Sequence, residues 1–342
     1  MFNKDFLTLK QLTATWNKTP FVETTLSRFF TVGRLRTRSA MVERGATGLK
    51  LIDPGALYQP APAASDHKLV RGQYTISAVK LGRVVSFSGE DIQDVRAFGT
   101  EDELETFEQV FNRDTATIRR WLEHTHEFQR GNVLKGRQVD SEGNLLFDFF
   151  GAAGVTAPQS VAIDYDTASR RQLQNLVADV VDYSRDGLGA GADDAQRFVM
   201  LHGKNDWRRF RTCDAVAALY DRYQDGAVNR AGATGQRAPF ELFDVAHLPY
   251  YGPSLGADEW QLVPVVPGLL RTDFTPLDNP ETANTLGLPG YATPHATPFN
   301  KGVQVEIASL PIHYITNPAA VIGGTSTGSI DGSVEAEEGA GA

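Results

Sequence analysis

Hydrophobic residues recur at three- and four-residue spacing through one long stretch of the chain, residues 100–131. This spacing is typical of an amphipathic α-helix, because such positions share one face. Thr100 and Glu103 form a capping-box pattern at its start, and Gly131 is a stop signal. At ~1.5 Å per residue the helix would span roughly 45 Å, well above the mean length of globular helices. Its expected apolar face consists of Leu104, Phe107, Phe111, Ile118, Leu122 and Phe128.

The segments before this helix predict a short helix and a strand. Residues 10–17 suit a short helix that lies along another surface, since the segment is too short to build its own core. In residues 31–43, Arg34, Arg36 and Arg38 alternate and would share one face of a strand. That row is either a solvated face or a set of guanidinium groups that meet carboxylates or phosphates.

A proline- and glycine-rich loop, residues 44–72, precedes the strand pattern of residues 73–87, and together they predict a long hairpin. An isolated two-stranded hairpin is marginal in water, and a loop this long counts against a compact domain. The apolar residues of the loop therefore need a partner, for which another copy of the chain is the simplest candidate. These residues are Leu49, Leu51, Ile52, Leu57 and Tyr58.

The chain after the long helix predicts a mixture of strands and helices. Residues 132–151 suit a β-hairpin with its turn at 140–144. Helices and strands then alternate as an α/β unit, with helices at 168–186 and 206–223 and strands at 197–202 and 240–248. Gly187 is expected to end the first of these helices.

The last part of the sequence is rich in turn residues. Prolines and glycines predict that turns dominate residues 249–298, whereas residues 302–310 and 312–322 suit two closing strands. The Gly/Ser/Glu-rich residues 323–342 predict a flexible tail.

Composition limits the classes of function. The formal net charge of −9 over 342 residues argues against a nucleic-acid binder by bulk electrostatics, so any DNA contact would have to be local. Cys213 is the only cysteine, which excludes an intramolecular disulfide and a cysteine-based zinc site and fits a reducing cytoplasm. The sequence lacks the apolar length of a signal-peptide core or a membrane span, so we expect no membrane attachment.

The sequence contains only weak signals for a catalytic, cofactor-binding or metal-binding site. The glycines at 187, 189 and 191 follow a helix, whereas a dinucleotide site requires them between a strand and a helix. His124 and His126 are two residues apart on a helix, so they point to different sides and cannot share a metal; we expect them at the surface or the edge of the core. We therefore predict no catalytic site, no cofactor and no metal.

Six short segments carry a resemblance to a known family. They are residues 96–106, 120–126, 134–136, 140–144, 285–291 and 309–318. Through them the chain resembles the lambda-type major capsid proteins of tailed bacteriophages, the major capsid protein E family. The resemblance runs from about Phe6 to Ile322 and is more specific in the helix region than in residues 30–75 and 225–260.

This resemblance implies an α+β chain with the major capsid fold that tailed phages share with herpesviruses. The implied parts are an N-terminal arm with the first strand (1–41), an extended β loop (42–87), a peripheral domain (88–159) with a spine helix (100–131), an axial domain (160–301), closing peripheral strands (302–322) and the flexible tail (323–342). The apolar face of the spine helix is then expected to pack on the peripheral sheet.

The implied function is that of a major capsid protein, whose copies form the hexamers and pentamers of an icosahedral shell around double-stranded phage DNA. The implied partners are other copies of the chain, a separate scaffolding protein, a portal, a possible decoration protein and packaged DNA that is contacted non-specifically. The protein would belong to the virion and assemble in the host cytoplasm. The alternatives are an encapsulin-like shell for protein cargo and a cytoplasmic α/β enzyme built on residues 197–248. We predict contacts between copies at Arg34, Arg36, Arg38, Leu49, Leu51, Ile52, Leu57, Tyr58, Lys68, Arg71, Glu101 and Asp102.

Overall fold

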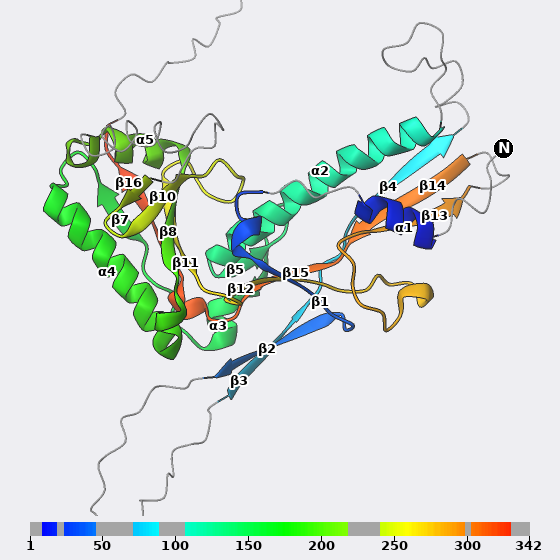
Figure 1. Ribbon diagram of the computed structural model, residues 1–342, viewed down its shortest axis with the longest axis horizontal. Coiled ribbons are helices and arrows are strands. Elements are labelled where there is room, and N and C mark those ends of the chain that lie inside the picture. Colours follow the sequence, from blue (N-terminus) through cyan, green and yellow to red (C-terminus); the bar gives the residue numbers. More distant parts are fainter. Residues whose placement is uncertain are drawn as a thin grey trace, which may run out of the picture.

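The computed structural model describes residues 9–18, 24–45, 71–88, 107–217, 240–297 and 302–329. The described residues form a six-stranded sheet and two three-stranded sheets, besides two hairpins. Figure 1 shows the largest sheet with its helices at one end of the molecule and a long helix with one of the smaller sheets at the other. A second three-stranded sheet lies between them. We call these the large, outer and central sheets. In the described part of the chain, no helix has the length and apolar character needed to cross a membrane.

The large sheet is mixed and separates two cores. Its strands, in spatial order, are β7 (Val161–Asp164), β16 (Ile322–Thr327), β11 (Glu259–Val265), β8 (Arg197–His202), β10 (Val245–Pro249) and β9 (Phe240–Leu242). Side chains of a strand alternate between faces. Phe198 and Met200 of β8 pack with the helices α4 (Arg170–Leu188) and α5 (Lys204–Thr212) on one face. Val199 and Leu201 face the central body of the molecule.

The central and outer sheets connect the large sheet to the long helix. The central sheet consists of β1 (Thr31–Arg34), β12 (Leu270–Phe274) and β15 (Pro311–Ile315). The outer sheet consists of β13 (Tyr291–Ala296), β14 (Gly302–Ser309) and β4 (Leu81–Ser88). Two hairpins complete the fold, β2 (Ser39–Gly45) with β3 (Arg71–Ser77), and β5 (Arg137–Val139) with β6 (Leu145–Asp148), which leads into α3 (Phe149–Ala153).

The long helix is present as α2 (Phe107–Leu134), and residues 100–106 lie outside the described part of the chain. Ile118 and Leu122 pack on Val303, Val305 and Ile307 of the outer sheet, as their spacing predicts. The short helix α1 (Leu9–Lys18) packs on the same core through Leu12 and Trp16, so this segment does lie along another surface.

Gly131 and Gly187 do not end their helices, and this corrects the prediction. Each lies inside a helix, α2 or α4, where the neighbouring chain comes too close for a side chain. A Cβ on Gly131 would lie 1.6 Å from Ser254 Oγ, and a Cβ on Gly187 would lie 2.2 Å from the carbonyl oxygen of Ala319. Glycine is present here for close packing, which a local stop signal does not distinguish.

Four segments that were predicted as single strands each form two strands. Residues 31–43 form β1 and β2, 73–87 form β3 and β4, and 312–322 lead from β15 through a short turn into β16. In each of these three cases the two strands belong to different sheets. Residues 240–248 form the hairpin β9–β10, which turns at Phe243 and Asp244 with positive φ angles of 54° and 62°. Alternation of apolar residues continues across such corners and therefore does not reveal them.

Four further expectations need correction. Residues 249–298 contain three strands, β11, β12 and β13, in addition to turns. The helix expected at 206–223 is interrupted: α5 ends at Thr212, where Cys213 has extended backbone angles, and residues 214–217 are helical again. Residues 218–239 lie outside the described part. The flexible tail expected at 323–342 is wrong for its first residues, since 323–327 belong to β16 and Gly323 and Gly324 pair with β11. Residues 330–342 lie outside the described part. The hairpin expected at 132–151 is present, but α2 occupies its first residues.

Candidate inter-subunit surfaces

The arginines expected to form one row lie on different elements. Arg34 is exposed at the end of β1, whereas Arg36 and Arg38 lie in the bend between β1 and β2. The side chain of Arg38 forms an exposed ion pair with Asp278. The single strand face predicted for these residues is therefore wrong, because the chain leaves the central sheet after Arg34.

The other predicted contact residues remain untested by the structure. Arg71 is the first residue of β3, and its side chain is not described. The rest, Leu49, Leu51, Ile52, Leu57, Tyr58, Lys68, Glu101 and Asp102, lie outside the described residues. The strands that carry the loop are well defined, however. Antiparallel β2 and β3 pair from Ser39 with Ser77 to Gly45 with Arg71, and Figure 1 shows this hairpin projecting away from the body of the molecule.

An apolar groove of about 560 Å³ lies between α2, β4 and the β5–β6 hairpin. Ile118 and Leu122 contribute to its floor, and Trp121 and Leu146 line it with 58% and 46% of their surfaces exposed. Trp121 lies three residues after Ile118 at the edge of the apolar face of α2, beyond the part that the outer sheet covers. Sequence reasoning missed this surface, although an aromatic residue beside an apolar stripe was a usable signal.

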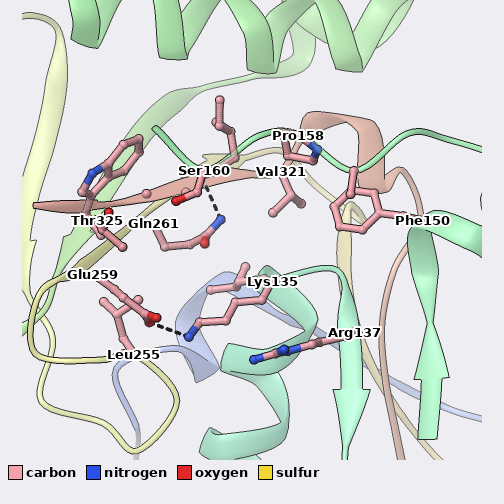
Figure 2. A pocket seen from close by; sticks show the side chains of 16 residues that line it. Lys135, Arg137, Phe150, Pro158, Ser160, Leu255, Glu259, Gln261, Val321 and Thr325 are labelled. Atoms are coloured by element: carbon pink, nitrogen blue, oxygen red, sulfur yellow. Dashed lines mark hydrogen bonds and ion pairs between the residues drawn. The ribbon is translucent and has the colours of Figure 1, made fainter. Parts of the chain in front are cut away.

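A second cavity, of about 280 Å³, lies where the end of α2 meets the large sheet (Figure 2). Lys135 Nζ lies 2.6 Å from Glu259 Oε2, which also accepts a hydrogen bond from the backbone N–H of Gly256 at 2.8 Å. Partial burial opposes ionisation of Glu259, but these donors prevail and lower its pKa. Gln261 Nε2 donates to the carbonyl oxygen of Ile322 at 2.8 Å. Lys135, Glu259 and Gln261 are thus paired with groups of the protein itself, and these pairs fix the end of α2 to the large sheet. Trp260 also lines the cavity, and its buried Nε1 has no hydrogen-bond partner among the described residues.

A pair of histidines lies in the core beneath α2. His126 is buried, which corrects the expectation of a surface or core-edge position, whereas His124 is exposed. His126 Nδ1 lies 3.1 Å from His313 Nε2, and His313 Nδ1 lies 2.9 Å from Thr272 Oγ1. Burial, and then the charge of Arg130, lowers the pKa of His126 to about 3 and that of His313 well below its usual range. Both rings are therefore neutral at physiological pH and join α2 to the central sheet.

A second histidine chain fixes α5 to the large sheet. His202 Nδ1 lies 2.6 Å from Asp206 Oδ2, His202 Nε2 lies 2.8 Å from His247 Nδ1, and His247 Nε2 lies 3.2 Å from the carbonyl oxygen of Leu242. Since a carbonyl only accepts, His247 donates to it from Nε2 and accepts from His202 at Nδ1. All three polar side chains are fully buried, and burial followed by His202 lowers the pKa of His247. The order of carboxylate and imidazole groups resembles that of a catalytic triad, but here the fully buried groups join α5 to the large sheet.

The described residues contain no group of three His, Cys, Asp or Glu side chains that could hold a metal ion. Comparison with family models gives the decisive observation. The model for phage major capsid protein E matches residues 8–326, which is nearly the whole chain. The chain belongs to the phage major capsid protein E family. This is a family of structural proteins, and its members form virus shells.

Solved capsid structures share the fold over most of their length. A prophage protein of E. coli CFT073 that is assigned as a capsid protein has a TM-score of 0.56 and 12% identity, and the match covers 94% of this chain and 99% of that one. The capsid of cyanophage P-SCSP1u has a TM-score of 0.53 and 8% identity, with coverage of 91% and 90%. The capsid of Ralstonia phage GP4 has a TM-score of 0.52 and 10% identity, again with coverage of 91% and 90%. A comparison with curated protein sequences finds no match.

These findings confirm the resemblance that the sequence motifs carry. The α+β fold is that of the tailed-phage major capsid proteins, and the capsid subunit is a component of a virion. A shell-forming role follows from the family, and the encapsulin-like alternative is less favoured. At 8–12% identity, the solved structures support the fold and do not locate the contacts between copies.

Proposed function

We propose that the subunit assembles as hexamers and pentamers into an icosahedral shell around double-stranded DNA, in the host cytoplasm. A separate scaffolding protein, a portal and, in some particles, a decoration protein would complete the assembly. The observation that carries this proposal is the family match over residues 8–326. The protein would act by binding copies of itself, without an enzymatic step.

The arrangement of the sheets suggests which parts of the subunit form the peripheral domain, the axial domain and the extended loop. We assign the outer sheet, α1 and α2 to the peripheral domain, and the large sheet with α4 and α5 to the axial domain. The β2–β3 hairpin would be the base of the extended loop, since it projects from the body (Figure 1). In this assignment, strands from distant parts of the sequence share a domain, as β4 and β14 do.

The groove beside Trp121 is the best supported contact surface among the described residues. Trp121 and Leu146 leave a large apolar area in water, and burying apolar surface contributes roughly 25 cal/mol per Å². If a neighbouring copy covers the groove, this burial would stabilise the contact, and the same contact would recur at every subunit of the shell. Single exposed apolar residues are ordinary, but residues that share a groove mark an interaction site.

Electron microscopy of the purified chain, alone and with a scaffolding protein, tests the proposed assembly. We expect hollow particles or capsomers. A compact monomer under all conditions would contradict the shell function.

Replacing Trp121 by serine tests the groove. We expect an unchanged unfolding temperature, because the side chain is mostly exposed, together with a severe loss of particles in sedimentation. Tyr251→Ser is the matched control, since Tyr251 is exposed and does not line the groove. Normal particles from the Trp121 variant would remove this surface from the interface.

A further inference from the structure

Helix α5 carries a row of cations on its exposed side. Lys204, Arg208 and Arg211 are exposed and follow at four- and three-residue spacing, so they share one face of the helix. We call them the α5 basic face. The opposite side of α5 is buried through Asp206, Trp207 and Phe210. The basic face therefore points away from the large sheet, at the end of the molecule that Figure 1 shows opposite the outer sheet.

The three cations have no acidic partner in the described part of the chain. None of the ion pairs found there includes Lys204, Arg208 or Arg211. Arg209 on the same helix differs, because its Nη1 lies 2.6 Å from Asp258 Oδ1 and its Nε donates to the carbonyl oxygen of Gly328 at 2.8 Å. Arg209 thus fixes the end of β16, whereas its three neighbours have no such structural task.

This arrangement is unfavourable for the isolated subunit. Lys204 is the first residue of α5, where the helix dipole repels a positive charge. Lys204 and Arg208 are also like charges at i and i+4, which destabilise a helix. The chain as a whole carries a net charge of −9, so general composition does not account for a local cluster of cations. A ligand of opposite charge would remove both costs.

The chemistry of the face favours a polyanion. Its exposed positions include no large apolar residue, because the aromatic side chains of α5 are buried. A protein interface normally has an apolar centre with aromatic anchors, whereas non-specific DNA binding depends on cations that neutralise phosphates. From Lys204 to Arg211 the row covers seven residue steps, or about 10 Å at 1.5 Å per residue. This length corresponds to about three phosphates of one strand at 3.4 Å each.

We infer that the α5 basic face binds the phosphate backbone of the enclosed DNA, as a local contact on an otherwise acidic subunit. This inference rests on the proposed function, since it assigns the DNA-facing side of the shell. The contact would be independent of base sequence and would weaken as salt rises.

The test compares full-length, unassembled subunits by fluorescence anisotropy with a 30-base-pair duplex of random sequence between 50 and 200 mM salt. The variant is K204Q/R208Q/R211Q, and the matched control R83Q/R120Q/R137Q removes three exposed charges from other elements. We expect the variant to bind at least about tenfold more weakly at 50 mM salt, and its salt slope to fall by up to about 2.7, at about 0.9 per phosphate. The control should bind like the native chain, and K204R/R208K/R211K should retain binding because charge alone is required.

Two results would overturn the inference. One is unchanged DNA binding by the variant, and the other is an equal loss in the control, which would indicate bulk charge only. If the variant still binds DNA but no longer forms shells, the face is a contact with an acidic protein surface. Unfolding temperatures establish that each variant is folded. Electron microscopy of the native chain tests the shell separately, so a failure of the proposed function is distinguishable from a failure of this inference.

Discussion

A glycine inside a helix makes the helix less stable than an alanine would, by about 1 kcal/mol. A glycine at such a position in a capsid subunit is therefore expected to have a packing role. Gly131 of α2 has one, because Ser254 lies directly against the helix backbone. The same reasoning applies to Gly187 of α4, against which the backbone at Ala319 packs. At the scale of single residues, these two positions determine how closely distant segments approach their helices.

Replacing Gly131 by alanine is expected to destabilise the subunit by about 1–3 kcal/mol, the usual cost of overpacking a core. Helix propensity favours alanine, so any destabilisation comes from the contact with Ser254. Chemical unfolding measures the change. Gly191→Ala is the control, because a Cβ there would meet nothing within 4 Å. Equal stability of the native chain and the Gly131 variant would show that Ser254 moves away freely.

The histidine pair His126 and His313 should make the subunit sensitive to acid. Their folded pKa values lie below 6.5, and that of His126 is about 3. Below pH 6.5 the unfolded chain therefore binds more protons than the folded chain, and stability falls as pH falls toward the folded pKa. The expected slope is about 1.4 kcal/mol per pH unit for each histidine. Arg130, which faces both rings, adds to the effect.

The measurement is the free energy of unfolding of subunits at pH 7 and pH 5. The variant H126F/H313L removes both titrating groups and should lose less stability between these pH values than the native chain does. H124Q, at an exposed position, should behave like the native chain. An acid sensitivity that is the same in H126F/H313L and in the native chain would contradict this account.

At the scale of elements, α2 holds the N-terminal segment with buried polar groups. Arg119 Nη1 donates to the carbonyl oxygen of Trp16 at 2.6 Å, and its guanidinium group lies over the Trp16 ring. Glu127 accepts a hydrogen bond from the backbone N–H of Leu26 at 3.0 Å. Arg119 and Glu123 also form a buried ion pair at 3.3 Å. These contacts determine where α1 and the segment at Leu26 lie on the helix.

Replacing Arg119 by alanine should destabilise the subunit by about 3–5 kcal/mol, because the buried ion pair with Glu123 at 3.3 Å would lose one of its partners. The double variant R119M/E123L removes both charges and should recover a large part of that loss. Thermal unfolding compares the two, with the exposed neighbour variant R120A as the control. If R119M/E123L is no more stable than R119A, the packing of the Arg119 stem on Trp16 matters more than the charge pair.

At the scale of the whole molecule, the projecting β2–β3 hairpin can be shortened at its far end without removing core residues. Gly45 and Arg71 are partners at the end of the hairpin, so their strands are already side by side. Deleting residues 48–68 would leave residues 46, 47, 69 and 70 to connect the strands, and four-residue loops are common in hairpins. The base of the hairpin stays anchored, since Ala40, Val42 and Ile76 are buried in the central core.

This deletion should therefore give a folded subunit with an unfolding temperature near that of the native chain but poor assembly. Electron microscopy and thermal unfolding measure the two properties. A Gly/Ser sequence of the same length in place of residues 48–68 separates loss of the apolar loop residues from loss of loop length. Normal shells from the deletion would refute the proposed role of the loop.

Much of this protein follows from local sequence. The long helix, the short helix before it, and the hairpin with its turn at 140–144 depend on spacing and turn residues that act within a few positions. The α+β class and the capsid family were also available, because the motifs between residues 96 and 318 are short and continuous. Of the candidate contact residues, those of the loop, the arginines, Glu101 and Asp102 were proposed from the sequence, and the groove beside Trp121 was missed.

The tertiary structure alone decided the partners of each strand and the burial of polar groups. Alternating apolar residues indicate which side of a strand is buried, but not which sheet the strand joins. The positions after Arg34, Ser77 and Ile315, where the chain passes from one sheet to another, could therefore not be predicted. Arg119 and His126 lie on the polar side of the α2 pattern, yet both are buried because Trp16 and His313, distant in the sequence, supply their partners. Such pairings depend on contacts across more than a hundred residues, and local spacing carries no record of them.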